Sequence, residues 1–224
     1  MRTPIERRSL QQQAADWLRD AIVRGQFAPA EVLTEQALTE QIGTGRGTVR
    51  SALFDLEAQE MVTRSPYSSW RVAELDDRAI WEIYTLRSAY EGLAARILAE
   101  RRDSLGLELV SAAFAGLATA EEAGTDARVK ADLGFHMSFV RQTGHQHLIR
   151  RHALLADKME WLYRWSEERW PRRNPLVAEH QPLFDALRSG TPDQAEQQVR
   201  THIDASIELD VAGYLSLAAT QEKP

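Results

Sequence analysis

The chain has 224 residues, of which 43% are hydrophobic, so it is long enough to form one large domain or two smaller ones with well-packed cores. Its 27 Lys and Arg residues are outnumbered by 33 Asp and Glu residues, and the net charge of −6 excludes a protein that coats nucleic acid through overall positive charge. The chain contains no cysteine, which excludes disulfides and thiolate metal sites.

The sequence predicts neither a targeting segment nor a membrane segment. Its start, MRTPIERRSL, is polar and lacks the apolar stretch of a signal peptide. No run approaches the roughly 20 apolar residues that are needed to span a bilayer. We therefore expect a soluble, cytoplasmic protein with no membrane partner.

Residues 1–75 predict a winged helix-turn-helix domain. Helical spacing of apolar residues indicates three helices, and two short segments read as strands of a ribbon. Thr34 can cap the second helix, and Gly43 can end it. The predicted helices cover about 10–24, 35–42 and 46–60, and the predicted strands are 61–64 and 70–73, with a connector at 26–32 and a polar tip at 65–69.

The third predicted helix carries a pattern that suits DNA reading. Val49 lies on its apolar face, whereas Arg46 and Arg50 are one turn apart and project together. Arginine can form bidentate contacts with guanine or phosphate, and Thr48 can contact phosphate or a thymine methyl group. In a helix-turn-helix, this second helix of the motif enters the major groove with its N-terminus first. The alternative is an ordinary helical hairpin with two solvated arginines.

Residues 76–224 predict an all-α helical bundle. Asp76 is suited to capping the first helix of this part, and no later stretch alternates convincingly as a strand. About six helices are expected, near 77–101, 104–122, 126–142, 145–169, 175–189 and 192–217. The mainly α fold class therefore combines a winged head with a helical domain.

Four residues of the helical domain have the spacing of a metal site. Asp132 and His136 are four apart, so they share one face of a helix. His180 precedes Gly190 by ten residues and His202 follows it by twelve, so two antiparallel helices bring them to similar heights. Three imidazoles and a carboxylate can bind a divalent first-row ion such as zinc, nickel or manganese.

The competing interpretation for each of these histidines is a hydrogen-bonded core residue. Pro182, two residues after His180, can kink or restart its helix and change where that side chain points. The remaining histidines, His145, His147 and His152, do not share one helix face, and we expect them at the surface or in turns.

Arg87 and Glu91 lie within an apolar stripe of the first bundle helix, where charges need partners. One interpretation is an internal ion pair between these two residues, which are four apart. The other is that Arg87 faces a cavity and holds the carboxylate of a ligand with its bidentate fork. A metal beside Arg87 would make the cavity seek anions, and a small hydroxy acid or sugar acid is the expected effector.

The chain resembles a known family. Its segment IVRGQFAPAEVLTEQALTEQIGTGRGTVRSALFDLEAQEMV, residues 22–62, is similar to the head of GntR-family transcriptional regulators. The most specific motifs are RGQF-x-P and TVRSAL-x-x-L-x-x-x-x-M-V. The helical remainder resembles the FCD-type ligand-sensing domain of the FadR branch, so the resemblance covers nearly the whole chain.

The resemblance implies roles for the residues singled out above. Arg46, Thr48 and Arg50 occupy positions that contact operator DNA in the family, and Arg87 matches an arginine that faces the effector pocket. Metal-containing members of the FadR branch use the same Asp-x-x-x-His, His, His arrangement, which here is Asp132, His136, His180 and His202.

The sequence departs from the family pattern at three places. Ala30 stands where the family usually has glycine. Gly45 and Gly47 flank Arg46 where serine, threonine or proline is more usual. The tip at 65–69 lacks the customary glycine of the wing.

The function expected from residues and resemblance together is ligand-responsive transcriptional regulation. A dimer would bind a palindromic operator, most often as a repressor, under the control of a small organic acid bound near a divalent metal. The first alternative is a metal-dependent enzyme that uses the Asp and three His residues. The second is a structural DNA-binding protein with no effector, which fits poorly with charged and imidazole groups inside the bundle.

Overall fold

The computed structural model describes residues 9–64, 69–167, 169 and 175–221, without the side chains of 218–221. The chain separates into two compact units, Met1–Glu74 and Leu75–Pro224. Among the described residues, no helix has both the length and the apolar character needed to cross a membrane.

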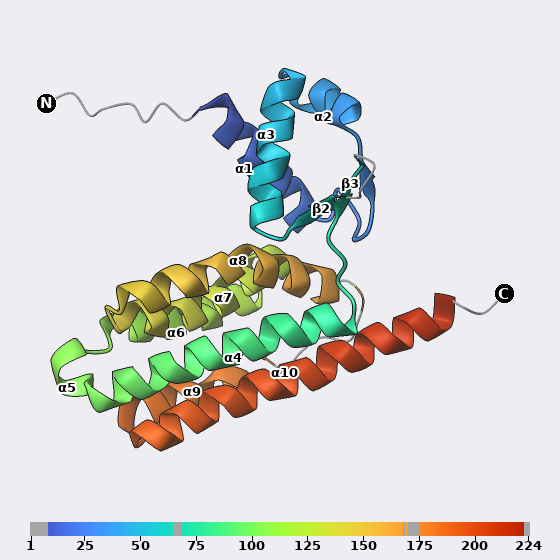
Figure 1. Cartoon of the computed structure of the whole chain (residues 1–224). Coiled ribbons are helices and arrows are strands. Elements are labelled where there is room, and N and C mark those ends of the chain that lie inside the picture. Colours follow the sequence, from blue (N-terminus) through green and yellow to red (C-terminus); the bar gives the residue numbers. More distant parts are fainter. Residues whose placement is uncertain (1–8, 65–68, 168, 170–174, 222–224) are drawn as a thin grey trace, which may run out of the picture. The chain divides into compact units, whose positions relative to one another are not determined.

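The N-terminal unit is a helix-turn-helix with a small antiparallel sheet (Figure 1). The mainly α fold class is confirmed, but the sheet has a strand that the sequence did not predict. Because β1 has only two residues, it leaves no periodic signal, and its position overlaps the predicted connector. The sheet order is β1-β3-β2. The elements are α1 (Leu10–Val23), β1 (Val32–Leu33), α2 (Glu35–Ile42), α3 (Arg46–Ala58), β2 (Val62–Arg64) and β3 (Trp70–Val72).

The corner between α2 and α3 is set by local caps. The Thr34 hydroxyl accepts a hydrogen bond from the Ala37 amide at 3.3 Å, as expected of an N-cap. Gly43 ends α2 with a left-handed φ of 71°, which glycine adopts without steric cost. Gly45 caps α3 without a side-chain hydrogen bond, so the first amides of α3 receive no side-chain cap from it.

Ala30 adopts a left-handed backbone with a φ of 63°. A residue with a Cβ is strained in this conformation, which glycine adopts freely, so the alanine noted in the sequence analysis as a departure costs backbone energy here. The segment is held in place because the Ala30 carbonyl accepts a hydrogen bond from the Arg71 side chain, and the Ala30 amide donates to the Ala73 carbonyl at 3.4 Å.

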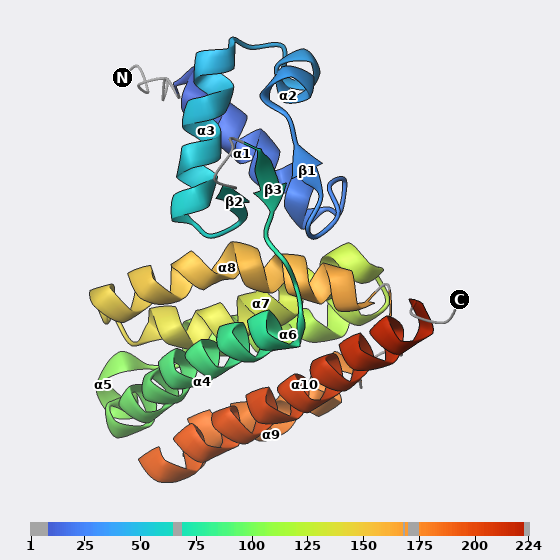
Figure 2. The ribbon, with the colours of Figure 1, turned by 45° about the vertical axis from the view of Figure 1, so that its right-hand side comes forward.

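The C-terminal unit is an all-α bundle in which α10 runs alongside α4 (Figures 1 and 2). Asp76 caps α4 as predicted, because its carboxylate accepts a hydrogen bond from the Ala79 amide at 2.7 Å. The described residues include a one-turn helix, α5, that the sequence did not predict. The helices are α4 (Asp77–Glu100), α5 (Arg102–Leu105), α6 (Glu108–Glu121), α7 (Thr125–Gln142), α8 (Gln146–Glu167), α9 (Leu176–Ser189) and α10 (Pro192–Gln221).

The turn between α9 and α10 fixes how these two helices face each other. Thr191 and Gln194 form a reciprocal capping box at the start of α10, with bonds of 2.8 Å and 3.2 Å. A Cβ on Gly190 would lie 2.7 Å from the Ala186 carbonyl oxygen, so this tight exit from α9 requires glycine. Helix α9 continues through Pro182. The antiparallel pair therefore sets the relative heights of the side chains that α9 and α10 send into the bundle.

Replacing Ala30 with glycine is expected to raise the free energy of unfolding by about 1 kcal/mol, because a left-handed backbone costs an L-residue roughly 1–2 kcal/mol. Thermal and urea unfolding of the full chain measure this change. Ala28→Gly is the matched control, since the backbone of Ala28 is not left-handed, and it should lower stability. A loss of stability in Ala30→Gly would contradict the strain assigned to this residue.

Candidate functional site

The N-terminal end of α3 presents the three residues that were predicted to contact DNA. Arg46 and Arg50 are exposed and lie one turn apart, and Thr48 is partly exposed. Val49 between them is fully buried, so the apolar face of α3 packs inward as its spacing predicts. The arrangement leaves this end of α3 open to an approaching phosphate or base edge.

Arg50 has a partner that the sequence did not reveal. Its Nε and Nη2 donate to the two carboxylate oxygens of Glu35 on α2, each at 2.8 Å. The hydrogen bond from Arg50 holds the pKa of Glu35 below its ordinary value. The Trp70 indole also donates to Glu35, at 3.4 Å. Because the Arg50 side chain is 60% exposed, the pair is weak and can be exchanged for a phosphate.

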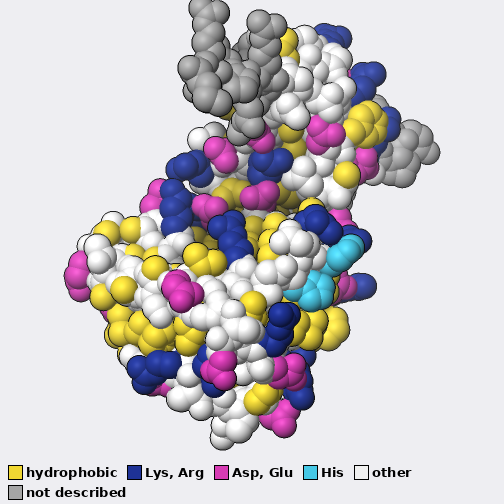
Figure 3. Space-filling model, turned by 90° about the vertical axis from the view of Figure 1, so that its left-hand side faces the viewer, with side chains coloured by type: hydrophobic (Ala, Val, Ile, Leu, Met, Phe, Trp, Pro, Cys, Tyr) yellow, Lys and Arg dark blue, Asp and Glu magenta, His cyan; other side chains and the backbone are white. Residues whose placement is uncertain are grey.

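Charge on the surface does not favour broad electrostatic binding of DNA. Figure 3 shows basic and acidic side chains interspersed on the described part of one face. Residues 1–75 hold nine arginines against ten acidic residues, so the head is nearly neutral. Most of the predicted wing tip, residues 65–68, lies outside the described residues. The overall charge of this unit therefore provides little attraction for DNA.

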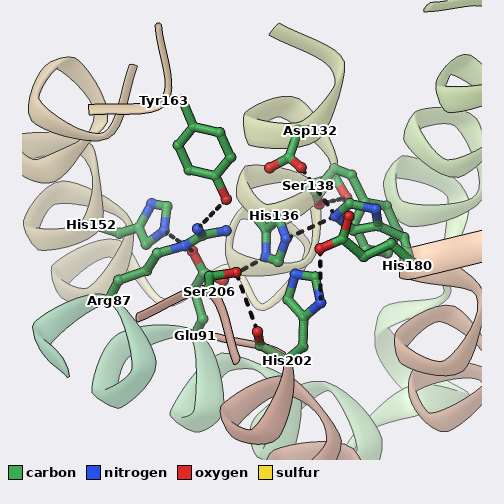
Figure 4. A network of polar contacts seen from close by, with 12 residues as sticks. Arg87, Glu91, Asp132, His136, Ser138, His152, Tyr163, His180, His202 and Ser206 are labelled. Carbon is green, nitrogen blue, oxygen red and sulfur yellow. Dashed lines mark hydrogen bonds and ion pairs between the residues drawn. The ribbon is translucent and has the colours of Figure 1, made fainter. Parts of the chain in front are cut away.

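Four side chains from three helices converge inside the C-terminal unit, and we call them the Asp–His cluster (Figure 4). Asp132 and His136 come from α7, His180 from α9 and His202 from α10. The three imidazole ring centroids lie 5.0–5.1 Å apart. An oxygen of Asp132 lies 3.4 Å from Nε2 of His180. The structure thus brings together all four residues that spacing and resemblance singled out.

Each histidine of the cluster has a second group facing its other nitrogen. Nδ1 of His136 lies 2.6 Å from Oε2 of Glu91. Nδ1 of His180 donates to the Leu176 carbonyl oxygen at 2.7 Å. Nδ1 of His202 lies 4.0 Å from a carboxylate oxygen of Glu179. The contacts of His136 and His180 are hydrogen bonds, and such a carboxylate or carbonyl partner is usual behind metal-bound histidines because it fixes the tautomer and the ring orientation. The carboxylate near His202 is too distant for a hydrogen bond.

These outer contacts decide which nitrogen carries a lone pair. Burial raises the pKa of Glu91, but Arg87 and His136 outweigh it and hold that pKa well below its usual range. Glu91 is therefore ionised and can only accept, so His136 donates through Nδ1. His180 must also donate through Nδ1, because its partner is a carbonyl. Nε2 of His136 therefore carries a lone pair in the neutral ring, and it faces Nε2 of His180 at 3.1 Å.

The charges of the cluster suit a cation. Burial lowers the pKa of His136 to about 4, and the charge of Arg87 adds to this effect. Burial lowers the pKa of His202 to about 2, with His136 and His180 adding to it. Burial raises the pKa of Asp132, but His180, His136 and Arg87 outweigh it, so this pKa is also lowered. At neutral pH, His136 and His202 are neutral donors to a metal and Asp132 is an anion.

A divalent ion satisfies this cluster better than a proton does. A proton between the Nε2 atoms of His136 and His180 would not satisfy Asp132 Oδ1 and His202 Nε2. These two atoms have no hydrogen-bond partner among the residues that the structure describes. The ligand atoms of the three histidines lie within 4.8 Å of one another. Ligands held tetrahedrally at about 2.0–2.1 Å from zinc lie roughly 3.3–3.5 Å apart, so small movements suffice. The donor set therefore fits a first-row metal.

A second polar network adjoins the cluster through Glu91. Nε of the buried Arg87 donates to Oε1 of Glu91 at 2.7 Å, and Nη1 donates to the Tyr163 hydroxyl at 2.8 Å. Nε2 of His152 lies 2.8 Å from the same Glu91 oxygen. The internal ion pair anticipated for Arg87 is thus present. Its Nη2 has no hydrogen-bond partner within the described part of the chain, so the guanidinium retains a free donor.

His152 was predicted to lie at the surface or in a turn, but it is buried, with only 6% of it exposed. His145 and His147 are exposed, as predicted. A usable signal existed, because His152 shares a helical stripe with the buried Leu148 and Leu155. This stripe was overlooked because the spacing of His152 was compared only with that of His145 and His147. Tyr163 and the contact from Glu91 to His136 were also missed, since both depend on tertiary packing rather than on spacing within one helix.

A small cavity borders both the cluster and the Arg87 network. Its volume is about 10 Å³, and it is lined by Arg128, Val129, Asp132, Tyr163, Glu167 and Leu176. This is room for about one water molecule. An organic acid could therefore enter only if side chains around the cavity move apart.

Comparisons with known proteins agree with this architecture. Residues 10–72 match the family described as bacterial regulatory proteins, gntR family, and residues 82–205 match the FCD domain. The HTH-type transcriptional repressor GlaR of Escherichia coli K12 is 30% identical over 202 residues, which are 84% of this chain and 89% of GlaR.

Two further proteins from Escherichia coli extend the likeness. The galactonate operon transcriptional repressor of strain K12 is 26% identical over 210 residues, with 83% of this chain and 90% of that repressor covered. The solved structure of McbR/YncC covers 92% of this chain and 99% of its own, with a TM-score of 0.71 at 20% identity, which shows a shared fold. The chain is therefore a transcriptional regulator rather than an enzyme, and it belongs to the GntR family, in the branch that carries the FCD domain.

Proposed function

We propose that the protein is a repressor that binds a palindromic operator as a dimer and releases it when a small organic acid binds beside a divalent metal. The observation that carries the proposal is the buried Asp–His cluster, in which His136 and His180 each have an outer hydrogen-bond partner on Nδ1 and face each other through Nε2. A filled structural core would have no use for this arrangement, because unsatisfied buried polar atoms are costly.

Asp132, His136, His180 and His202 would hold the metal, for which zinc, nickel and manganese are the candidates. A bound divalent ion would supply a Lewis-acidic centre for a carboxylate or hydroxyl oxygen of the effector. Glu91 would hold the His136 ring in place, and the Leu176 carbonyl would do the same for His180.

Arg87 is the proposed effector contact. Its Nε remains paired with Glu91, while its free Nη2 donor can bind a carboxylate without breaking that pair. Helix α4, which carries Arg87, begins at Asp77, directly after the end of the N-terminal unit at Glu74. Because α4 is covalently joined to the DNA-binding unit, a shift of α4 on binding would be passed on to that unit.

On the DNA side, Arg46, Thr48 and Arg50 would contact the operator from the N-terminal end of α3. Arg50 would exchange its exposed contact with Glu35 for a phosphate or base. Two copies of α3 in a dimer would read two inverted half-sites, as two-fold helix-turn-helix proteins do. The effector would have to bind the DNA-free state more tightly, since only a difference in affinity can shift the equilibrium.

The proposal predicts that acid binding weakens operator affinity. DNA selected by the zinc-loaded protein from a random-sequence pool should contain inverted repeats. A panel of hydroxy acids and sugar acids should include one that weakens binding about 5- to 150-fold, the usual range of allosteric coupling. Chelator-treated protein should lose this response. Arg46→Ala should lose DNA binding while Arg24→Ala, an exposed change in the same unit, keeps it.

Two results would contradict the proposal. One is operator affinity that Arg46→Ala leaves unchanged at physiological salt. The other is protein, purified without chelator and supplied with zinc, that retains no metal and responds to no acid.

Glu91→Gln is expected to weaken zinc affinity about 10- to 100-fold, because the uncharged amide no longer strengthens the basicity of His136. Competition with a fluorescent chelator measures the affinity. Glu100→Gln, on the exposed side of the same helix, is the matched control. The double variant Arg87→Met with Glu91→Gln avoids an unpaired buried charge and should show the same loss. Unchanged zinc affinity in both Glu91 variants would contradict the role assigned to this carboxylate.

A further inference from the structure

Arg128 is a buried cation whose partners do not account for it. It lies on α7, one turn before Asp132, and is only 8% exposed. Among the described residues, its one hydrogen bond is a long one of 3.5 Å from Nη1 to the Glu121 carbonyl oxygen. Its Nε has no hydrogen-bond partner among the described residues. A buried guanidinium in this state is costly unless an anion reaches it.

The other two buried arginines in the described part of the chain are differently placed. Arg87 is paired with Glu91 at 2.7 Å. Arg164 is paired with Glu160 at 2.7 Å and also contacts Asp126. In the described residues, no acidic side chain lies within 4.0 Å of Arg128. The contrast indicates that the guanidinium of Arg128 is available to an anion from outside the helical bundle.

The position of Arg128 connects it to the proposed effector site. Arg128 lines the small cavity together with Asp132 of the Asp–His cluster and Tyr163, whose hydroxyl binds Arg87. Glu167 also lines this cavity, so one acidic group faces it in addition to Asp132. The cavity thus joins three features: a metal ligand, the hydroxyl that reaches one buried arginine, and a second arginine that lacks a carboxylate.

We propose that Arg128 binds the second acidic group of a dianionic effector, which is a short dicarboxylate. This inference rests on the proposed function, in which the first carboxylate binds at the metal and Arg87. Arg128 and Asp132 are four residues apart on α7, so they leave the same face of the helix about 6 Å apart along its axis, and short diacids with two or three intervening carbon atoms are the first to test. The guanidinium fork provides the matching bidentate donor.

The rival explanation is that Arg128 only caps helix α6, since Glu121 is its last residue and cations are favourable at a helix C-terminus. That role would use Nη1 and would not distinguish between ligands. A comparison of matched ligands therefore separates the two explanations.

The experiment uses isothermal titration of the zinc-loaded full chain with two matched pairs, succinate with succinamate and glutarate with glutaramate. In each pair, the amide replaces one carboxylate at nearly constant size. The unsubstituted protein should bind the better diacid about 10- to 100-fold more tightly than its monoamide, as expected for a charge-assisted contact. Arg128→Gln should remove this preference and leave the affinity for the monoamide unchanged, while Arg128→Lys should keep part of it.

Arg141→Gln, an exposed change on the same helix, is the control and should keep the full preference. Thermal unfolding of each zinc-loaded variant checks that it is folded. A preference that survives in folded Arg128→Gln overturns the inference, as does equal binding of diacid and monoamide by the unsubstituted protein, which leaves the acid effector itself standing. Zinc binding with no binding of either ligand class overturns both the inference and the acid effector.

Discussion

The helical unit depends on one constraint, which is that buried lone pairs and charges must be satisfied together. The Nε2 atoms of His136 and His180 lie 3.1 Å apart, and Asp132 and His202 complete the group. Their outer hydrogen bonds prevent the rings from turning to relieve this contact, because Glu91 and the Leu176 carbonyl both require Nδ1–H donors. A metal cation at the centre would bind the inward-facing nitrogens while the outer hydrogen bonds of His136 and His180 stay in place.

Glu91 connects this centre to the remainder of the bundle. One of its oxygens holds His136, and the other accepts from Arg87 and His152. The metal-facing side of the network and the anion-facing side therefore share a single carboxylate. A ligand that altered the charge at Arg87 would change the environment of His136 through this one side chain, which would link the proposed metal to the proposed effector.

Spacing within helices predicted most of the architecture and the convergence of the four side chains of the Asp–His cluster, because helical period and caps are local properties. Asp132 and His136 share a face by their interval, and the Gly190 turn sets His180 and His202 at equal height. The strand β1 was missed, since two residues carry no period. Other tertiary contacts were also not foreseen. They are the hydrogen bonds of Glu91 and His152, the Arg50–Glu35 pair, and the lack of an acidic partner for Arg128 among the described residues. They arise where different helices meet, and no local pattern encodes those contacts.

The central claim is that the Asp–His cluster binds a metal through inward-facing nitrogens. The most direct measurement is anomalous diffraction at the zinc edge from crystals of the zinc-loaded protein. The account predicts one ion per chain, at about 2.0–2.2 Å from Nε2 of His136, His180 and His202 and from an oxygen of Asp132. An ion bound elsewhere, with these four side chains still contacting one another as they do without metal, would contradict it.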